Sequence, residues 1–347
     1  MQRITGLTAI LVGLGVSLCS AMTPLITGGE RILFVGNNMT GYAPPGVGGL
    51  DVAVRSVLAS GSVNVTTECV ALPGTGELSD VYAQGVATER IRNGDYDFVV
   101  LQGWLQPENY YDGARDAFVQ SVRQFHQVIV SSGAKTMLYM TYPNVFQAFR
   151  PDVANYETVM NVTAQSYLMA ANEVGGAPVA PVGHIFRTFV KAPPPGTDAW
   201  LLYEANVWNS GRPEPHGQLA SQYGRLLEGY VFYKRLTGRS PIGLRQTFYP
   251  SADPRIDSAL QYRAETVTGR WVDTYNSTGV VQHAGAAGYQ VAGVPQVAPW
   301  VFLLDGSRYC AGARGMGNSA PCVLIRSDGR SGVRSPFTGA TAGPTRK

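Results

Sequence analysis

The chain has 347 residues, of which 45% are hydrophobic and 15% are charged, and its formal net charge is +3. The apolar share excludes a disordered chain, because enough apolar surface is available to offset the ordering entropy. So small a net charge gives no reason to expect a nucleic-acid partner. A single long apolar run excludes a protein with several membrane spans.

The N-terminal segment, residues 1–21, has the layout of a secretory signal peptide. Arg3 precedes an apolar stretch from Ile4 to Leu18, and small residues lead to a cleavage position after Ala21. A membrane anchor is the alternative, but the stretch is shorter than the roughly 20 apolar residues that a span needs. We therefore expect an extracellular or periplasmic protein that has no membrane contact once the signal is removed.

Export would place the cysteines in an oxidising compartment. Cys310 and Cys322 enclose 11 residues rich in glycine and alanine, and we predict a disulfide between them. Cys69 then has no partner and is predicted to be a buried thiol. Four Asn-x-Ser/Thr sites permit glycosylation in a eukaryotic secretory pathway: Asn38, Asn64, Asn161 and Asn276.

Short apolar runs alternate with amphipathic segments along the first three quarters of the chain. The runs predict strands at residues 31–36, 64–72, 96–101, 135–142 and 178–182. The amphipathic segments predict a helix capped by Asp51 and helices at residues 81–91, 114–130, 156–172, 219–236 and 255–274. This alternation predicts a three-layer α/β/α sandwich around a parallel five-stranded sheet. In such sheets the chemistry lies at the carboxyl ends of the strands.

The C-terminal residues 279–347 have a different character from residues 22–278, which we assign to the α/β domain. Helical periodicity disappears, and glycine, alanine, valine and proline dominate. We expect a small β-rich or irregular module, closed by the Cys310–Cys322 disulfide, and a loose tail from about Ser335.

Five short motifs follow one another at the predicted strand ends and at the start of the 219–236 helix. They read ILFVGNNMT, LPGTGEL, DYDFVVLQ, LYMTYP and PHGQLASQYGRLLEGYVFYKRLTGRSP. In this order they resemble the SGNH (GDSL-like) hydrolases, most of all the branch that writes its first block Gly-Asn-Ser-Phe-Thr. The resemblance covers about residues 30–245 and implies a flavodoxin-like sheet. It also implies ester hydrolysis by a serine that a histidine activates.

Carried over residue by residue, the resemblance implies a complete set of catalytic positions. Asn38 occupies the nucleophile position, and Gly76 and Gln102 occupy those of the oxyanion donors. His216 is the base, and Pro213 stands where the family has the aspartate that orients the histidine.

Two of these positions depart from the family pattern. The Asn38 amide neither loses a proton readily nor attacks an acyl carbon, and Pro213 has no hydrogen-bond acceptor in its side chain. Glu214 is an alternative carboxylate for orienting His216, and Thr40 is an alternative hydroxyl, although a loop-capping role fits Thr40 better. Removing one member of such a triad leaves only about 10³–10⁴-fold catalysis over water.

Aromatic residues near the strand ends are candidates to contact a ligand. Trp104, Tyr203 and Trp208 can stack on sugar rings if they line the cleft, and simple loop packing is the alternative. No His, Cys, Asp or Glu residues show metal-ligand spacing, and no P-loop or dinucleotide fingerprint occurs, so we expect neither a metal nor a cofactor.

Two functions remain open at this point. In the first, the protein is a catalytically degenerate secreted protein that binds a glycan or an acylated saccharide, or that assembles with copies of itself. In the second, it is an active carbohydrate esterase or deacetylase that uses His216 with an altered nucleophile.

Overall fold

The computed structural model describes residues 22–74, 76–103, 112–143, 153–204, 219–266, 271–272 and 275, and four short strands after residue 300. The chain divides into two compact units, Met1–Tyr275 and Asn276–Lys347. The first unit contains the predicted α/β fold.

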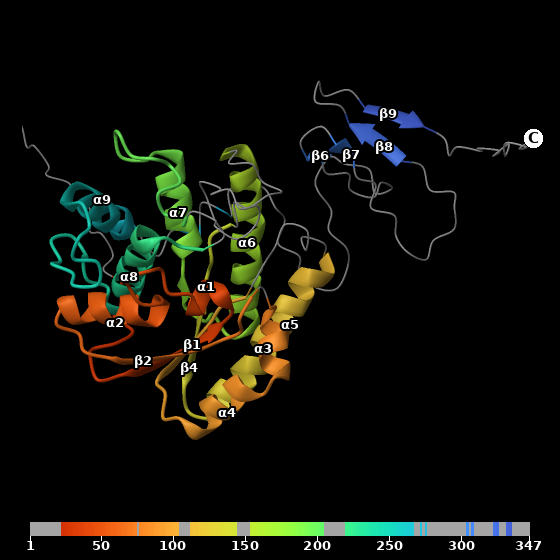
Figure 1. Ribbon diagram of the computed structural model, residues 1–347. Coiled ribbons are helices and arrows are strands. Elements are labelled where there is room, and N and C mark those ends of the chain that lie inside the picture. The colour runs from red at the N-terminus through yellow and green to blue at the C-terminus, as the bar shows by residue number, and fades with distance from the viewer. Residues whose placement is uncertain are drawn as a thin grey trace, which may run out of the picture. The chain divides into compact units, whose positions relative to one another are not determined.

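A five-stranded parallel sheet forms the centre of the first unit and confirms the predicted fold class (Figure 1). Its strands are β1 (Arg31–Gly36), β2 (Thr66–Ala71), β3 (Phe98–Leu101), β4 (Lys135–Tyr139) and β5 (Val179–Ala180). They lie in the order β2-β1-β3-β4-β5, and each neighbouring pair is parallel. This is the flavodoxin-like strand order, which has its ligand crevice at the carboxyl ends of the strands.

Strand β1 is the central strand of the candidate site. Its residues Ile32 to Val35 are fully buried, as expected for a parallel strand that is covered on both faces. Val35 pairs with Val70 on β2 and with Leu101 on β3. This register brings the carboxyl ends of the three strands to one edge of the sheet.

Helices cover both faces of the sheet, and each face has its own hydrophobic core. One core contains Ile32 and Phe34 of β1, the other Leu33 and Val35. The first core is closed by α2 (Leu50–Ser60), α7 (Val182–Lys191), α8 (Gln222–Thr237) and α9 (Pro254–Glu265). The second is closed by α3 (Leu78–Ala83), α4 (Val86–Asn93), α5 (Asp112–Ser131) and α6 (Val153–Glu173).

Three helix predictions need correction. The predicted 81–91 helix is two helices, α3 and α4, because Gly85 between them adopts a left-handed φ of 77°. The helix expected to be capped by Asp51 begins at Leu50, with its N-cap at Gly49, two residues before the predicted cap, and with Asp51 in its first turn. The predicted 255–274 helix ends at Glu265, as α9.

A charged pair lies inside the core on α8. Arg225 Nη1 donates to Glu228 Oε2 at 2.7 Å, and both side chains are 0% exposed. Arg225 Nη2 also donates to the backbone oxygen of Tyr42 at 2.9 Å, and the Tyr139 hydroxyl donates to Glu228 Oε1 at 2.8 Å. Burial raises the pKa of the Glu228 carboxyl, against the opposing effect of Arg225. The pair therefore joins α8 to β4 and to the loop after β1.

We expect the Arg225→Met variant to lose about 3–5 kcal/mol of unfolding free energy, because it leaves the buried Glu228 carboxylate without its cation. The double variant Arg225→Met/Glu228→Met should recover most of this loss, since two apolar side chains of similar volume often replace a buried ion pair at little cost. Urea unfolding of the three proteins measures both effects. Equal losses in the single and double variants would contradict this account.

A second polar cluster lies where the first unit ends. His184 Nδ1 on α7 is 3.0 Å from the Tyr275 hydroxyl, and Arg187 lies over the Tyr275 ring at 5.5 Å. Arg187 also pairs with Glu157 of α6. Burial lowers the pKa of His184 from 6.5 to about 4, with Arg187 as a further cause. The folded protein therefore holds this imidazole neutral.

The unfolded chain binds a proton at His184 below about pH 6.5, whereas the folded protein binds it only near pH 4. We therefore expect the His184 contribution to stability to be complete above pH 6.5 and to fall as the pH drops towards 4, by up to about 3 kcal/mol. Unfolding free energies of the wild type and of His184→Leu, measured from pH 7 to pH 4, isolate this effect. The gap between the two proteins should change across that window, and a constant gap would contradict the prediction.

The described part of the second unit consists of two antiparallel strand pairs. β6 (Leu303–Leu304) pairs with β7 (Ser307–Arg308), and β8 (Cys322–Ile325) pairs with β9 (Ser331–Arg334). Cys310 lies outside the described residues, so its disulfide with Cys322 stays a prediction, as do the domain boundary at 278/279 and the signal peptide. Cys69 on β2 is free and partly buried, and burial raises the pKa of its thiol to about 12.

Candidate active site

The first motif forms a tight turn at the carboxyl end of β1. Asn37 caps the short helix α1 (Asn38–Gly41), because its side-chain oxygen accepts from Met39 N at 3.0 Å. Asn37 Nδ2 donates to Gly76 O at 3.0 Å, and Asn38 N donates to Gly74 O at 3.3 Å. These bonds tie the first motif to the second, so the predicted residues Asn38 and Gly76 lie together.

Gln102, directly after β3, holds this turn through hydrogen bonds of its side chain. Its Oε1 accepts from Asn37 N at 2.9 Å and from the Thr40 hydroxyl at 2.8 Å, in a site where the Gln102 side chain is 1% exposed. The atom facing the Asn37 N–H must be the amide oxygen, because an amide nitrogen there would set donor against donor. Gln102 Nε2 donates to Gly103 O at 2.9 Å. The side chain thus holds the turn, and its role as an oxyanion donor stays a prediction.

The glycine before the turn is required by the same contacts. A Cβ atom on Gly36 would collide with Gln102 Oε1 and with the Thr40 hydroxyl. The absence of a side chain at position 36 is therefore what lets Gln102 approach the strand end.

The side chain at the predicted nucleophile position makes none of the hydrogen bonds that hold the turn among the described residues. Asn38 is partly buried, and its Oδ1 is buried without a hydrogen-bond partner among the described residues. Thr40, the alternative hydroxyl, is 1% exposed and donates to Gln102. This geometry favours a loop-capping role for Thr40 over a role as an alternative nucleophile.

The remaining predicted site residues are divided between the core and the undescribed segments. Tyr203 is 4% exposed, its hydroxyl lies 2.8 Å from that of Tyr156, and it donates to Pro143 O at 3.0 Å. Tyr203 is therefore a core residue. Its predicted contact with a ligand stays a prediction, and its packing does not support that contact. Outside the described residues lie Trp104, Trp208, Pro213, Glu214 and His216.

Two residues that build the site were missed in the sequence. Asn37 was not singled out, although an Asn directly after an apolar run is a typical helix cap. Arg225 was also missed, although an arginine in the mostly apolar helix that follows His216 is an unusual feature. Its bond to Tyr42 O fixes the chain four residues after Asn38.

The sequons differ in their exposure. Asn64 and Thr66, just before and at the start of β2, are both exposed. Asn161 lies within α6 with a buried Oδ1, and its Thr163 is 2% exposed. Asn276 lies outside the described residues. Asn64 therefore has the accessibility that a glycan needs, while modification at any of the four sites stays a prediction.

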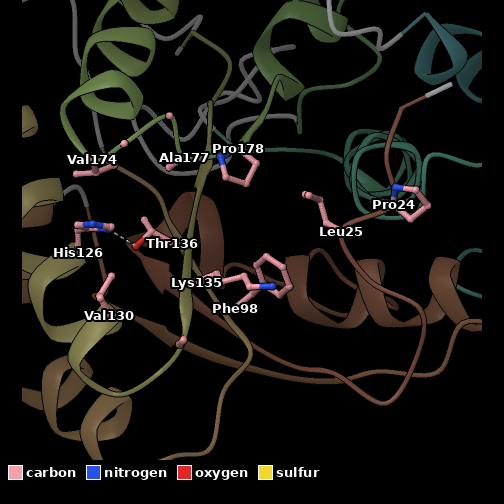
Figure 2. Close-up of a pocket in the computed structure, with 13 residues that line it drawn as sticks. Pro24, Leu25, Phe98, His126, Val130, Lys135, Thr136, Val174, Ala177 and Pro178 are labelled. Atoms are coloured by element: carbon pink, nitrogen blue, oxygen red, sulfur yellow. Dashed lines mark hydrogen bonds between the residues drawn. The ribbon is translucent and has the colours of Figure 1, made fainter. Parts of the chain in front are cut away.

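Neither a metal cluster nor a spanning helix is found in the part of the chain that the structure describes. No group of three or more His, Cys, Asp or Glu side chains there is placed to hold a metal ion. None of its helices is long and apolar enough to cross a membrane. A groove of about 380 Å³ lies at the amino ends of β3 and β4, the edge of the sheet opposite Asn38 (Figure 2).

Comparisons with known proteins return similar folds. No protein-family model and no curated protein matches the chain. A DUF4886 family protein from Bacteroides uniformis is 13% identical, with a TM-score of 0.49 over 68% of this chain and 93% of that one. A putative SGNH hydrolase from Slackia heliotrinireducens is 19% identical, with a TM-score of 0.43 over 60% and 100%. Axe2, an acetylxylan esterase from Geobacillus stearothermophilus, is 15% identical, with a TM-score of 0.43 over 61% and 96%.

These similarities concern the fold, and at such identities they assign no chemistry to this chain. What the site can do depends on its own residues. The described hydrogen bonds fix the backbone of the turn, and the side chain at position 38 is an amide.

We expect Gln102→Leu to destabilise the fold by at least about 2 kcal/mol, because Asn37 N–H and the Thr40 hydroxyl lose their acceptor in a buried site. Thr40→Val is the matched control, since it removes one of the two donors and leaves Gln102 in place. It should cost less than Gln102→Leu. Thermal or urea unfolding gives the comparison, and an unchanged stability for Gln102→Leu would show that another acceptor serves both donors.

Proposed function

We propose that this chain is a secreted SGNH hydrolase-like protein that binds a carbohydrate ligand and has lost the catalytic nucleophile. The observation that carries the proposal is Asn38 at the head of an otherwise complete strand-end turn. The hydrogen bonds of the turn fix the backbone around position 38, which favours a defined binding site. The Asn38 amide, in contrast, does not act as a nucleophile on an acyl carbon.

The chemistry of the expected reaction explains why the nucleophile matters. A serine attacks the acyl carbon as its proton passes to a histidine, and a carboxylate holds that histidine in the correct tautomer. An asparagine amide at position 38 supplies no such proton, and Pro213 supplies no acceptor to His216. Both changes weaken the reaction at its first step.

Binding is supported by Asn38 Oδ1, which has no hydrogen-bond partner among the described residues. A buried acceptor without a donor is unfavourable, and a hydroxyl of a bound ligand would supply the hydrogen bond that the described residues do not. Saccharides carry such hydroxyls in abundance, and Trp104 and Trp208 are proposed to stack on the sugar rings. We extend the proposal to a glycan or an acylated saccharide as the partner and to export through the 1–21 signal, whereas self-assembly is the less direct alternative.

The competing function is an active carbohydrate esterase or deacetylase that uses His216 with Glu214 and an altered nucleophile. The buried, hydrogen-bonded state of the Thr40 hydroxyl argues against Thr40 as that nucleophile. Measured activity separates the two functions.

We expect the wild-type protein to hydrolyse p-nitrophenyl acetate no faster than the Asn38→Ala control. Asn38→Ser should show weak activity at most, because Pro213 leaves the imidazole without its carboxylate. Asn38→Ser/Pro213→Asp should be more active than Asn38→Ser alone. Initial rates of the four proteins provide the test.

The proposed loss of catalysis is wrong if the wild type turns over acetyl esters at an ordinary enzymatic rate of about 1–10³ s⁻¹ and His216→Ala abolishes this rate. The binding half of the proposal is measured separately, by affinity electrophoresis in acetylated xylan, chitosan and mannan. Retardation by at least one polymer that Asn38→Ala and Trp208→Ala both weaken supports it, and free migration in all three contradicts it.

A further inference from the structure

The groove at the amino ends of β3 and β4 is distinct from the candidate active site. It has a volume of about 380 Å³ and is formed by residues from the chain start, β3, α5, β4 and the α6–β5 loop. Figure 2 shows His126, Thr136 and Val130 on one side of β4, and Lys135, Phe98 and Leu25 on the other. Its volume lies within the range of about 300–1,000 Å³ that is typical of small-ligand sites.

The walls of this groove are mainly apolar. They include Leu25 and Phe98 on the Lys135 side of β4, and Val130 and Val174 on its other side (Figure 2). The walls therefore favour a ligand with an apolar body.

The charge in the groove comes from a lysine without a counter-ion. The described residues include three lysines, and two of them reach a carboxylate: Lys191 to Glu157 at 3.0 Å and Lys234 to Glu265 at 2.9 Å. Lys135 reaches none within the described part of the chain, and its ammonium group lies 5.5 Å from the centre of the Phe98 ring. This lysine is therefore available to an anion.

Asp97 is the carboxylate residue beside Lys135: its backbone oxygen accepts from Lys135 N at 2.9 Å, and its carboxylate accepts from Arg31 N at 2.8 Å and forms no ion pair with the Lys135 ammonium group. His126 Nδ1 is 2.9 Å from the Thr136 hydroxyl, and neither residue carries a negative charge. The residues that line the groove include no aspartate or glutamate. The nearby Glu173, next to Val174 in the sequence, is paired with Arg123 at 2.6 Å.

We propose that this groove binds a small monocarboxylate with an apolar body, such as an arylacetate, with its carboxylate on Lys135 and its body against the walls around Phe98 and Leu25. The charge complementarity with the unpaired ammonium group selects an acid over its neutral analogue. The proposal does not depend on the proposed function, because the groove and Asn38 lie at opposite ends of the sheet.

Phenylacetate and its neutral analogue phenylacetamide serve as the probes, with affinity measured by ligand-observed NMR on the full chain. We expect phenylacetate to bind more tightly than phenylacetamide. Lys135→Gln should weaken phenylacetate binding about fivefold, because the contact is solvent-accessible. Lys135→Arg should retain the binding, since it retains the charge.

Lys191→Gln is the matched control, because it removes one positive charge at a site where the lysine is already paired. It should leave phenylacetate binding unchanged. The proposal is overturned if phenylacetate does not bind, if phenylacetamide binds equally well, or if Lys135→Gln and Lys191→Gln have the same effect.

Discussion

The geometry of the strand-end turn depends on one buried oxygen atom, Gln102 Oε1. Two donors from the neighbouring strand end, Asn37 N–H and the Thr40 hydroxyl, converge on it. A buried backbone N–H requires an acceptor, and Gln102 can approach Asn37 N–H because Gly36 has no side chain to collide with it. The ends of β1 and β3 are thereby fixed relative to each other, and Asn37 carries the constraint on to Gly76.

The turn is also held from the opposite side, by α8. The Arg225 guanidinium reaches Tyr42 O just beyond α1, and Glu228 ties the same helix to β4 through Tyr139. The two networks are of different chemistry, one of neutral amides and one of buried charges. Together they hold the segment that carries Asn38 between the sheet and the longest buried helix of the first core.

Most of the sheet was predictable from the sequence, because a strand covered on both faces is a short, nearly uninterrupted apolar run, as at β1. The convergence of Asn38, Gly76 and Gln102 followed from their motif order. What Gln102 does there was not predictable, since its orientation is set by a donor 65 positions away. The break at Gly85 was missed because the hydrophobic spacing continues across it. The burial of Tyr203 was not predictable, because a loop sequence has no periodicity that reveals which of its side chains pack into the core.

Among the described residues, none of the hydrogen bonds that form the turn uses the side chain of Asn38. They involve its backbone N–H and its neighbours, so the fold at this edge of the sheet does not depend on which small polar residue stands there. Either asparagine codon becomes a serine codon by a single transition at its second base. One nucleotide change can therefore exchange the amide at position 38 for a hydroxyl, and the described hydrogen bonds of the turn would survive that exchange.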